Sequence, residues 1–66
     1  MQITLVFTYP SGQERGITVD SYTLFRNEGK IQFKIGKTED EYVLESGDKV
    51  DVYAVGYMTT MKRNKV

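Results

Sequence analysis

Apolar and polar side chains alternate along several short stretches of this 66-residue chain. In residues 30–35 every second residue is Ile or Phe, and the residues between them are Lys or Gln. Residues 2–9 show the same period, with one face formed by Ile3, Leu5, Phe7 and Tyr9. A period of two is typical of β strands, whereas a helix needs a period near 3.6. The chain is therefore predicted to form strands that each bury one face, with Phe33 buried between Ile31 and Ile35.

Turn-forming residues separate these stretches. Tight turns are indicated at Pro10-Ser11-Gly12, at 26–29 and at Ser46-Gly47-Asp48. Between them we expect further strands at residues 14–19, 41–45 and 49–55, a polar loop at 36–40 and an extension of the last strand over 57–61. The composition agrees, because Val, Ile, Thr, Tyr and Phe make up 26 of the 66 residues and fit the pleated surface of a sheet.

Residues 20–29 allow two interpretations. As a strand, the stretch needs a bulge near Asp20, because the apolar positions change phase between Val19 and Tyr22. As a helix, it would run over 21–28 for about two turns and end at Gly29. Tyr, Thr and Phe are mediocre helix formers, so we favour the strand, followed by a hairpin turn with Gly29 in the left-handed conformation.

These elements predict a single all-β domain over residues 1–61, followed by a flexible basic tail at 62–66. Five or six antiparallel strands in a meander would close fully or partly, as in a small SH3-like barrel. The alternative is a small β-grasp fold with a short helix at 21–28. Met1-Gln2-Ile3 and residues 44–50 resemble the opening strand of ubiquitin and the approach to the last strand of small sulfur-carrier proteins, which have that fold. Those families end in Gly-Gly, which residues 62–66 replace, so the resemblance implies no conjugation chemistry.

The residue types that most enzymes and metal sites use are missing from the chain. Without His or Cys there is no disulfide framework, no zinc site of the usual kind, and no base for a nucleophilic Ser or Thr other than Lys. Gly36-Lys37-Thr38 lacks the first Gly of a phosphate-binding loop, because Ile31 occupies that position. Glu39-Asp40-Glu41 lacks the spacing of a calcium loop. We therefore expect a non-catalytic protein without metal or cofactor.

The longest uninterrupted apolar runs, at residues 5–7 and 52–55, are far too short to cross a membrane. No basic and apolar leader of the signal-peptide type opens the chain, so we expect a cytoplasmic protein without a membrane partner. The absence of cysteine is compatible with that compartment.

The run at 52–55 is apolar on both faces, and a domain of this size has one small core. One face is expected to pack inside and the other to meet a partner, because Tyr and Met are enriched in interface cores. The chain is therefore predicted to act as a small binding module, of a kind that phages often encode. Its partner would be another protein, or itself in a homodimer or higher oligomer. The predicted interface residues are Tyr53, Val55, Tyr57, Met58 and Met61.

The uneven distribution of charge suggests a different partner. The chain is neutral overall, with a pI of about 6.2, yet residues 26–37 carry four cations against one carboxylate and residues 39–51 carry six carboxylates against one Lys. These stretches are predicted to attract each other across a hairpin. Alternatively, a basic strand face would bind single-stranded nucleic acid through Arg26, Lys30, Lys34, Lys62 and Arg63. A third hypothesis is a small-ligand pocket at a subunit interface.

Overall fold

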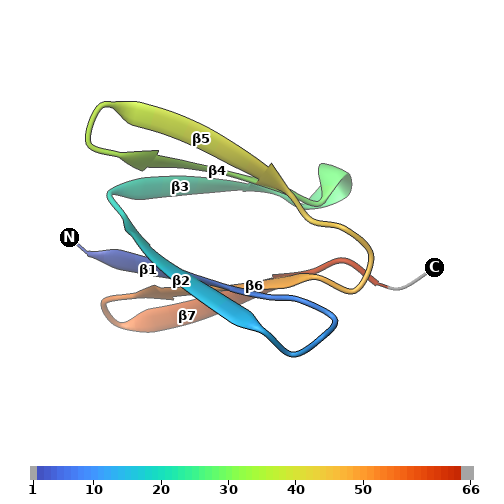
Figure 1. The fold of residues 1–66 in the computed structure, drawn as a ribbon. Helices are drawn as coiled ribbons and strands as arrows, with labels where there is room; N and C mark the ends of the chain where they lie inside the picture. The colour runs from blue at the N-terminus through green and yellow to red at the C-terminus, as the bar shows by residue number, and fades with distance from the viewer. Residues whose placement is uncertain (1, 65–66) are drawn as a thin grey trace.

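The computed structural model of the chain describes residues 2–64, which form seven antiparallel strands in two sheets (Figure 1). The strands are β1 (Ile3–Thr8), β2 (Glu14–Val19), β3 (Ser21–Phe25), β4 (Lys30–Ile35), β5 (Thr38–Val43), β6 (Lys49–Ala54) and β7 (Tyr57–Lys62). One sheet has the order β2-β1-β6-β7 and the other the order β3-β4-β5. The two sheets lie one above the other, and the predicted all-β fold is confirmed.

The topology differs from the predicted meander of five or six strands. β1 lies inside the four-stranded sheet, where it pairs with β6 as well as with β2, and Leu5 is opposite Val52. In the part of the chain that the structure describes, no ladder joins the two sheets, so a closed barrel is not seen. The central strands β1 and β6 carry three of the completely buried apolar side chains, Leu5, Val50 and Val52. Placing both at the centre of one sheet removes the most apolar surface from water.

The phase change at Asp20 marks a corner between the sheets. β2 ends at Val19 in the four-stranded sheet, and β3 begins at Ser21 in the other. Asp20 holds this corner, because its N–H donates to the Lys34 carbonyl (2.8 Å) and its Oδ2 accepts from the Gly36 N–H (2.6 Å). The bulge predicted near Asp20 is therefore a change of sheet.

The strand interpretation of residues 20–29 is confirmed, and the helix at 21–28 of the β-grasp alternative is wrong. Residues 21–25 form β3, and only Arg26–Glu28 form a 3-10 turn, η1. Gly29 follows in the left-handed conformation, with φ +60°. The spacing of the apolar residues explains this outcome. Tyr22 and Leu24 are two residues apart and both pack against the core, which a strand permits and a helix does not.

Two-residue turns displace two predicted boundaries. The turn after β4 takes only residues 36–37, so the polar loop predicted at 36–40 is wrong and β5 occupies 38–43. The turn at 55–56 sends the chain back, so residues 57–61 belong to a new strand beside β6 instead of extending it. The glycine of each turn has a positive φ, +61° and +86°, which permits so short a connection.

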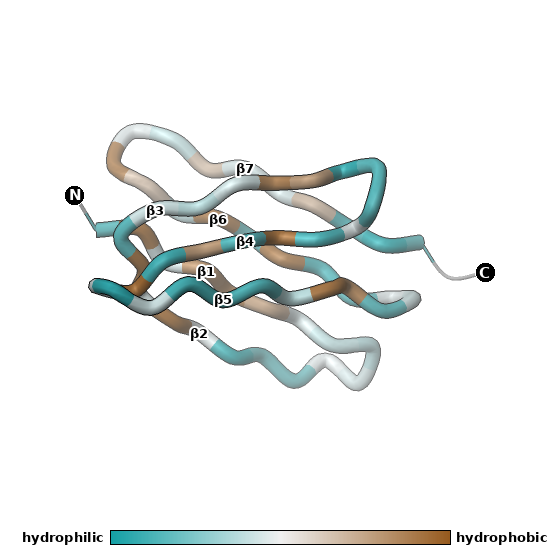
Figure 2. The backbone as a smooth tube through the Cα atoms, turned by 90° about the horizontal axis from the view of Figure 1, so that it is seen from above, coloured by the Kyte–Doolittle hydropathy of each residue, from teal (hydrophilic) through white to brown (hydrophobic). Residues whose placement is uncertain are grey.

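The core lies between the two sheets, and hydrophobic residues are spread along strands of both sheets (Figure 2). Fully covered side chains come from both sheets and from the connection after β5: Leu5, Val19, Ile31, Leu44, Val50 and Val52. Burial decreases along β4, from Ile31, which is fully buried, through Phe33, which is half-buried, to Ile35, which is 46% exposed. The prediction that Phe33 is buried between Ile31 and Ile35 is met only in part. Phe33 packs against the core but is half-buried, and Ile35 is exposed, because the β4–β5 hairpin stands away from the other sheet (Figure 1).

Asp48 holds the connection between β5 and β6. Its buried carboxylate accepts hydrogen bonds from the Tyr42 hydroxyl (3.2 Å) and the Glu45 N–H (2.9 Å). Burial and the Asp48 charge raise the pKa of Tyr42 to about 12. The Tyr42 ring also packs against Phe7, with 4.9 Å between the ring centroids, so one tyrosine links the loop to the core.

Residues 62–64 of the predicted basic tail are joined to the rest of the fold. Lys62 is the last residue of β7. The Arg63 N–H donates to the Asp48 carbonyl (2.9 Å), and the Arg63 carbonyl accepts from the Gly47 N–H (2.8 Å). The predicted domain boundary at residue 61 therefore falls inside β7. Residues 65 and 66 lie outside the described residues.

Candidate protein interface

Large apolar side chains reach the surface mainly at one end of the four-stranded sheet. Six of them are exposed among the described residues, and four of these six lie in the β6–β7 hairpin. Their exposed fractions are 45% for Tyr53, 79% for Val55, 51% for Tyr57 and 59% for Met58. We call these four residues the hairpin patch.

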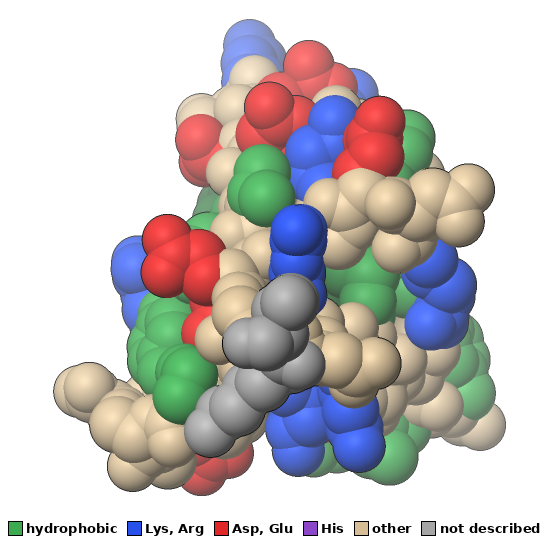
Figure 3. Space-filling model, turned by 90° about the vertical axis from the view of Figure 1, so that its right-hand side faces the viewer, with side chains coloured by type: hydrophobic (Ala, Val, Ile, Leu, Met, Phe, Trp, Pro, Cys, Tyr) green, Lys and Arg blue, Asp and Glu red, His purple; other side chains and the backbone are tan. Residues whose placement is uncertain are grey.

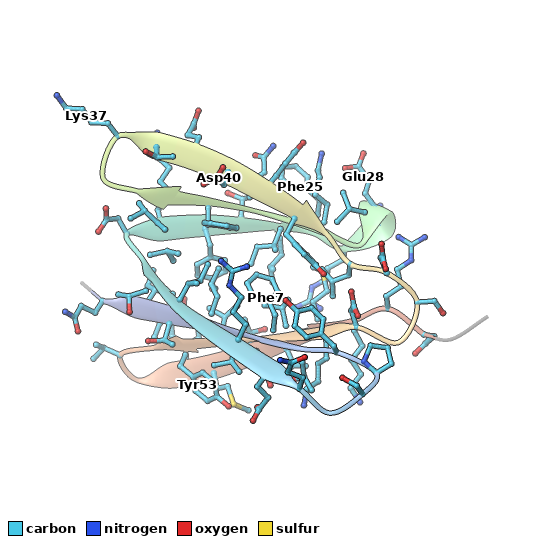
Figure 4. The ribbon with its side chains drawn as sticks, in the orientation of Figure 1. Phe7, Phe25, Glu28, Lys37, Asp40 and Tyr53 are labelled. Carbon is cyan, nitrogen blue, oxygen red and sulfur yellow. The ribbon has the colours of Figure 1, made fainter. Side chains whose placement is uncertain are left out.

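Strand alternation in β6 and β7 decides which way each side chain of the patch points. Ala54 pairs with Tyr57 next to the two-residue turn, which places Tyr53 opposite Met58. Val52 is completely buried, so its neighbour Tyr53 points away from the other sheet (Figure 4). Tyr53 and Met58 form a non-hydrogen-bonded pair, in which cross-strand side chains lie closest together.

The same alternation removes Met61 from the predicted interface. Met61 pairs with the buried Val50 and is itself only 3% exposed, so it belongs to the core. The signal for this outcome was a turn at Gly56, because a two-residue turn there gives Met61 the same orientation as Val50. The interface prediction for Met61 is therefore wrong, whereas the other four predicted residues are exposed and adjacent in the hairpin.

Tyr57 points the opposite way from Tyr53 and Met58, towards the open end of the other sheet, so the hairpin patch wraps around the end of the hairpin. Its hydroxyl lies 2.8 Å from the Tyr22 hydroxyl of β3, and this hydrogen bond, with burial, raises the pKa of Tyr22. Nearby, Arg26 donates to the Thr60 carbonyl and to the Thr59 hydroxyl, both at 3.3 Å. These bonds join β3 and η1 to β7 along one side of the sandwich.

Arg26 also covers part of the free edge of β7. Because Ala54 and Tyr57 flank a two-residue turn, the backbone groups of Met58, Thr60 and Lys62 point away from β6. The Arg26 guanidinium donates a hydrogen bond to the carbonyl of Thr60, the middle one of these three residues. Covering an edge in this way opposes strand-to-strand association. The patch is thus available through its side chains more than through the backbone of β7.

The outer face of the four-stranded sheet is polar beyond the patch. Asp51 has a side chain only 10% exposed, and it accepts a 2.7 Å hydrogen bond from the Thr60 hydroxyl and pairs with Lys49 at 3.4 Å. Lys62 is opposite Lys49 at the far end of this face. The Thr8 hydroxyl is buried without a hydrogen-bond partner. The apolar surface therefore stops within two residues of the hairpin turn on each strand.

The five basic residues of the nucleic-acid hypothesis do not share one face. Lys30 and Lys34 lie on the outer face of β4, where they pair with Glu41 (3.5 Å) and Glu39 (3.4 Å) across the β4–β5 hairpin. Lys62 lies on the outer face of the other sheet. Figure 3 shows basic and acidic side chains interspersed on the side that carries the C-terminus. The predicted attraction between the basic and acidic stretches is confirmed.

The charges of the β4–β5 hairpin adjust to these contacts. A hydrogen bond to Glu28, 3.2 Å from the Lys30 ammonium, raises the pKa of Lys30. A hydrogen bond from Gln32 (3.2 Å) and the charge of Lys30 lower the pKa of Glu41. Lys30 also lies 4.9 Å from the centre of the Phe25 ring. Its charge is therefore already matched within the chain.

Two hollows bear on the small-ligand hypothesis. A shallow groove of about 580 Å³ crosses the outer face of the three-stranded sheet, and its lining is polar: it includes Ser21, Thr23, Gln32, Lys34, Glu39 and Glu41. A narrower slot of about 280 Å³ separates β2 from β5. Within residues 2–64, His, Cys, Asp and Glu form no group of three or more that could hold a metal ion.

Comparisons with protein-family models, with curated proteins and with solved structures find no match to this chain. No helix in the described part of the chain has the length and apolar character needed to span a membrane. The functional assignment therefore depends on the geometry of the chain itself.

Proposed function

We propose that the chain is a non-catalytic binding module that acts through protein–protein contacts, and that its hairpin patch binds a second copy of the chain. The proposal rests on one observation, the concentration of four exposed large apolar side chains within residues 53–58. Exposed apolar side chains that lie together mark interaction sites far more often than single ones do. Tyr and Met are also the residue types that interface cores favour.

The size of the patch predicts a weak dimer. A standard interface takes about 800 Å² from each partner, roughly a sixth of the 4662 Å² surface described here. An aromatic side chain offers about 150–250 Å² in total, so the two half-exposed tyrosines supply about 200 Å². Val55 and Met58 add a similar area, which brings the patch to about half of the standard size. We therefore expect association at micromolar or higher concentration, in exchange with the monomer.

Sedimentation velocity, from micromolar to near-millimolar concentration, tests this proposal. The wild-type chain should move from 7.6 kDa towards twice that mass as its concentration rises. The double variant Tyr53→Glu/Met58→Glu should stay monomeric, because each carboxylate would have to be desolvated in the interface. Val43→Glu is the matched control, since Val43 is 53% exposed on the opposite sheet and should leave the dimer intact.

Two results would contradict the proposal. One is a wild-type chain that remains a monomer over the whole concentration range. The other is a dimer that survives the double substitution in the patch but not the control substitution, which would place the interface on the three-stranded sheet.

A further inference from the structure

The two long sides of the sandwich differ. On one side β3 and η1 are joined to β7 by the Tyr22–Tyr57 and Arg26–Thr60 hydrogen bonds. On the other side β2 and β5 are the neighbouring edges of the two sheets, and no hydrogen bond or ion pair joins these two strands. Beyond the Asp20 corner, which joins the end of β2 to Lys34 and Gly36, the second side is therefore open, with a free strand edge on each sheet.

An apolar slot lies between these open edges. It has a volume of about 280 Å³. Its apolar lining includes Phe7, Ile17, Phe33 and Tyr42, and charged residues at its rims are Arg15 of β2 and Asp40 and Glu41 of β5. Phe7 lies between the sheets, and Asp40 marks the β5 rim above it (Figure 4). Phe33 is only half-buried, so part of the core surface is accessible from the slot. An occupant with apolar side chains would complete this burial.

The register of β5 shows what its free edge offers. The hairpin pair Ile35–Thr38 and the 2.7 Å bond from the Leu44 N–H to the Gly29 carbonyl fix the alternation. The backbone groups of Glu39, Glu41 and Val43 therefore point away from β4, towards the open side. The side chains of these three residues lie on the outer face of the sheet, whereas those of Asp40 and Tyr42 face the slot.

β4 shows which sequence suits this strand. On the outer face, Lys34 pairs with Glu39 (3.4 Å) and Lys30 pairs with Glu41 (3.5 Å). On the inner face of the same strand, Ile31 is opposite Tyr42 and contributes to the core. On its paired side, β5 thus contacts a strand with basic and apolar side chains in alternation. In these pairs the side chains of Glu39 and Glu41 remain 74% and 52% exposed, so they can also contact a strand on the free side, about 4.8 Å away.

We propose that the free edge of β5 and the adjoining slot bind an extended segment of a partner protein, which adds to the sheet as a further strand. Basic side chains of the segment lie opposite Glu39 and Glu41, and the apolar side chains between them cover the slot. The partner is a different sequence from β5 itself, because three consecutive carboxylates repel a second copy of this edge. This site is separate from the hairpin patch and does not depend on it.

A capped hexapeptide, Val-Ile-Lys-Phe-Lys-Ile, is the probe. In antiparallel register its two lysines lie opposite Glu41 and Glu39, and its Ile and Phe project over the slot. Titration of the nitrogen-labelled protein should shift the amide resonances of β5 and β2. The charge-reversed peptide Val-Ile-Glu-Phe-Glu-Ile should bind at least tenfold more weakly, because like charges would face each other across the strands.

Substitutions in the protein test whether Glu39 and Glu41 bind the lysine peptide. Glu39→Gln/Glu41→Gln should weaken binding of the lysine peptide about fivefold, the effect of losing two cross-strand ion pairs. Glu14→Gln/Glu45→Gln is the control, since it changes the net charge equally at exposed positions outside β5. Both variants should remain folded, because exposed ion pairs contribute little to stability.

The proposal is overturned if neither peptide shifts the β5 resonances, in which case the carboxylates only protect the edge. Equal binding of the two peptides, or an equal loss in the control variant, would also overturn it. The variant Tyr53→Glu/Met58→Glu should still bind the lysine peptide, which keeps this test independent of dimer formation.

Discussion

Two methionines three residues apart on β7 should differ widely in how much the same substitution destabilises the protein. Met61 is 3% exposed and lies opposite the fully buried Val50, whereas Met58 is 59% exposed and lies opposite Tyr53. Replacing a buried Met by Ala costs about 2–5 kcal/mol, from the lost transfer free energy and the cavity left behind. β7 is an edge strand and relaxes into part of that cavity, so we expect about 2–3 kcal/mol for Met61→Ala.

Met58→Ala should change the free energy of unfolding by less than about 1 kcal/mol, because it removes only a surface cross-strand contact with Tyr53. A domain of this length has about 3–10 kcal/mol of stability in total, so Met61→Ala should remove a large share of it. Urea denaturation followed by circular dichroism measures both effects. With a slope of about 1 kcal/mol/M for so small a protein, the midpoint should fall by about 2–3 M for Met61→Ala.

The two variants should also separate stability from association. Met58→Ala should weaken the proposed dimer while leaving the monomer stable, so the denaturation curves are recorded at a concentration where the wild type is monomeric. Equal midpoints for Met58→Ala and Met61→Ala would refute the strand register described here. A larger loss for Met58→Ala would reverse the two faces of β7.

Two other predictions concern Tyr42 of β5 and two glycines, Gly56 in a turn and Gly16 in β2. The pKa of Tyr42 is raised to about 12, above its unfolded value of about 10, so the folded state keeps the phenol proton more tightly. The contribution of this proton to stability is complete below pH about 10 and is lost as the pH rises towards 12. The free energy of unfolding measured across this range should therefore fall less steeply with pH in Tyr42→Phe than in the wild type. Parallel curves for the two proteins would contradict this. Gly56→Ala should cost about 1–2 kcal/mol in a thermal melt, because φ is +86° at this position. Gly16→Ala, where φ is ordinary and the added Cβ meets open space, should be nearly neutral, and an equal cost at both positions would remove the argument from backbone conformation.

The candidate interface was partly predictable from the sequence. Tyr53, Val55, Tyr57 and Met58 were predicted as surface residues from the apolar run around Gly56, and they are exposed. The sequence did not predict the two-residue turn at that glycine. The length of this turn sets the orientation of every later residue in β7. No local signal indicated that Arg26 would cover the β7 edge, since the two segments are 34 residues apart.

What the sequence determined by itself is where most of the strands lie. Alternation in residues 3–8, 14–19 and 30–35 is a local property, and strand formation there follows from side chains that must face either core or water. The attraction between Lys34 and Glu39 was also readable, because a hairpin brings close neighbours in sequence together. Only the tertiary structure decided that β1 pairs with β6, that Asp20 turns the chain from one sheet to the other, and that burial fades from Ile31 to Ile35. These features depend on how the two sheets stack and diverge. Alternation with a period of two does not reveal them, because it looks the same in a strand that the other sheet covers fully and in one that it covers only in part.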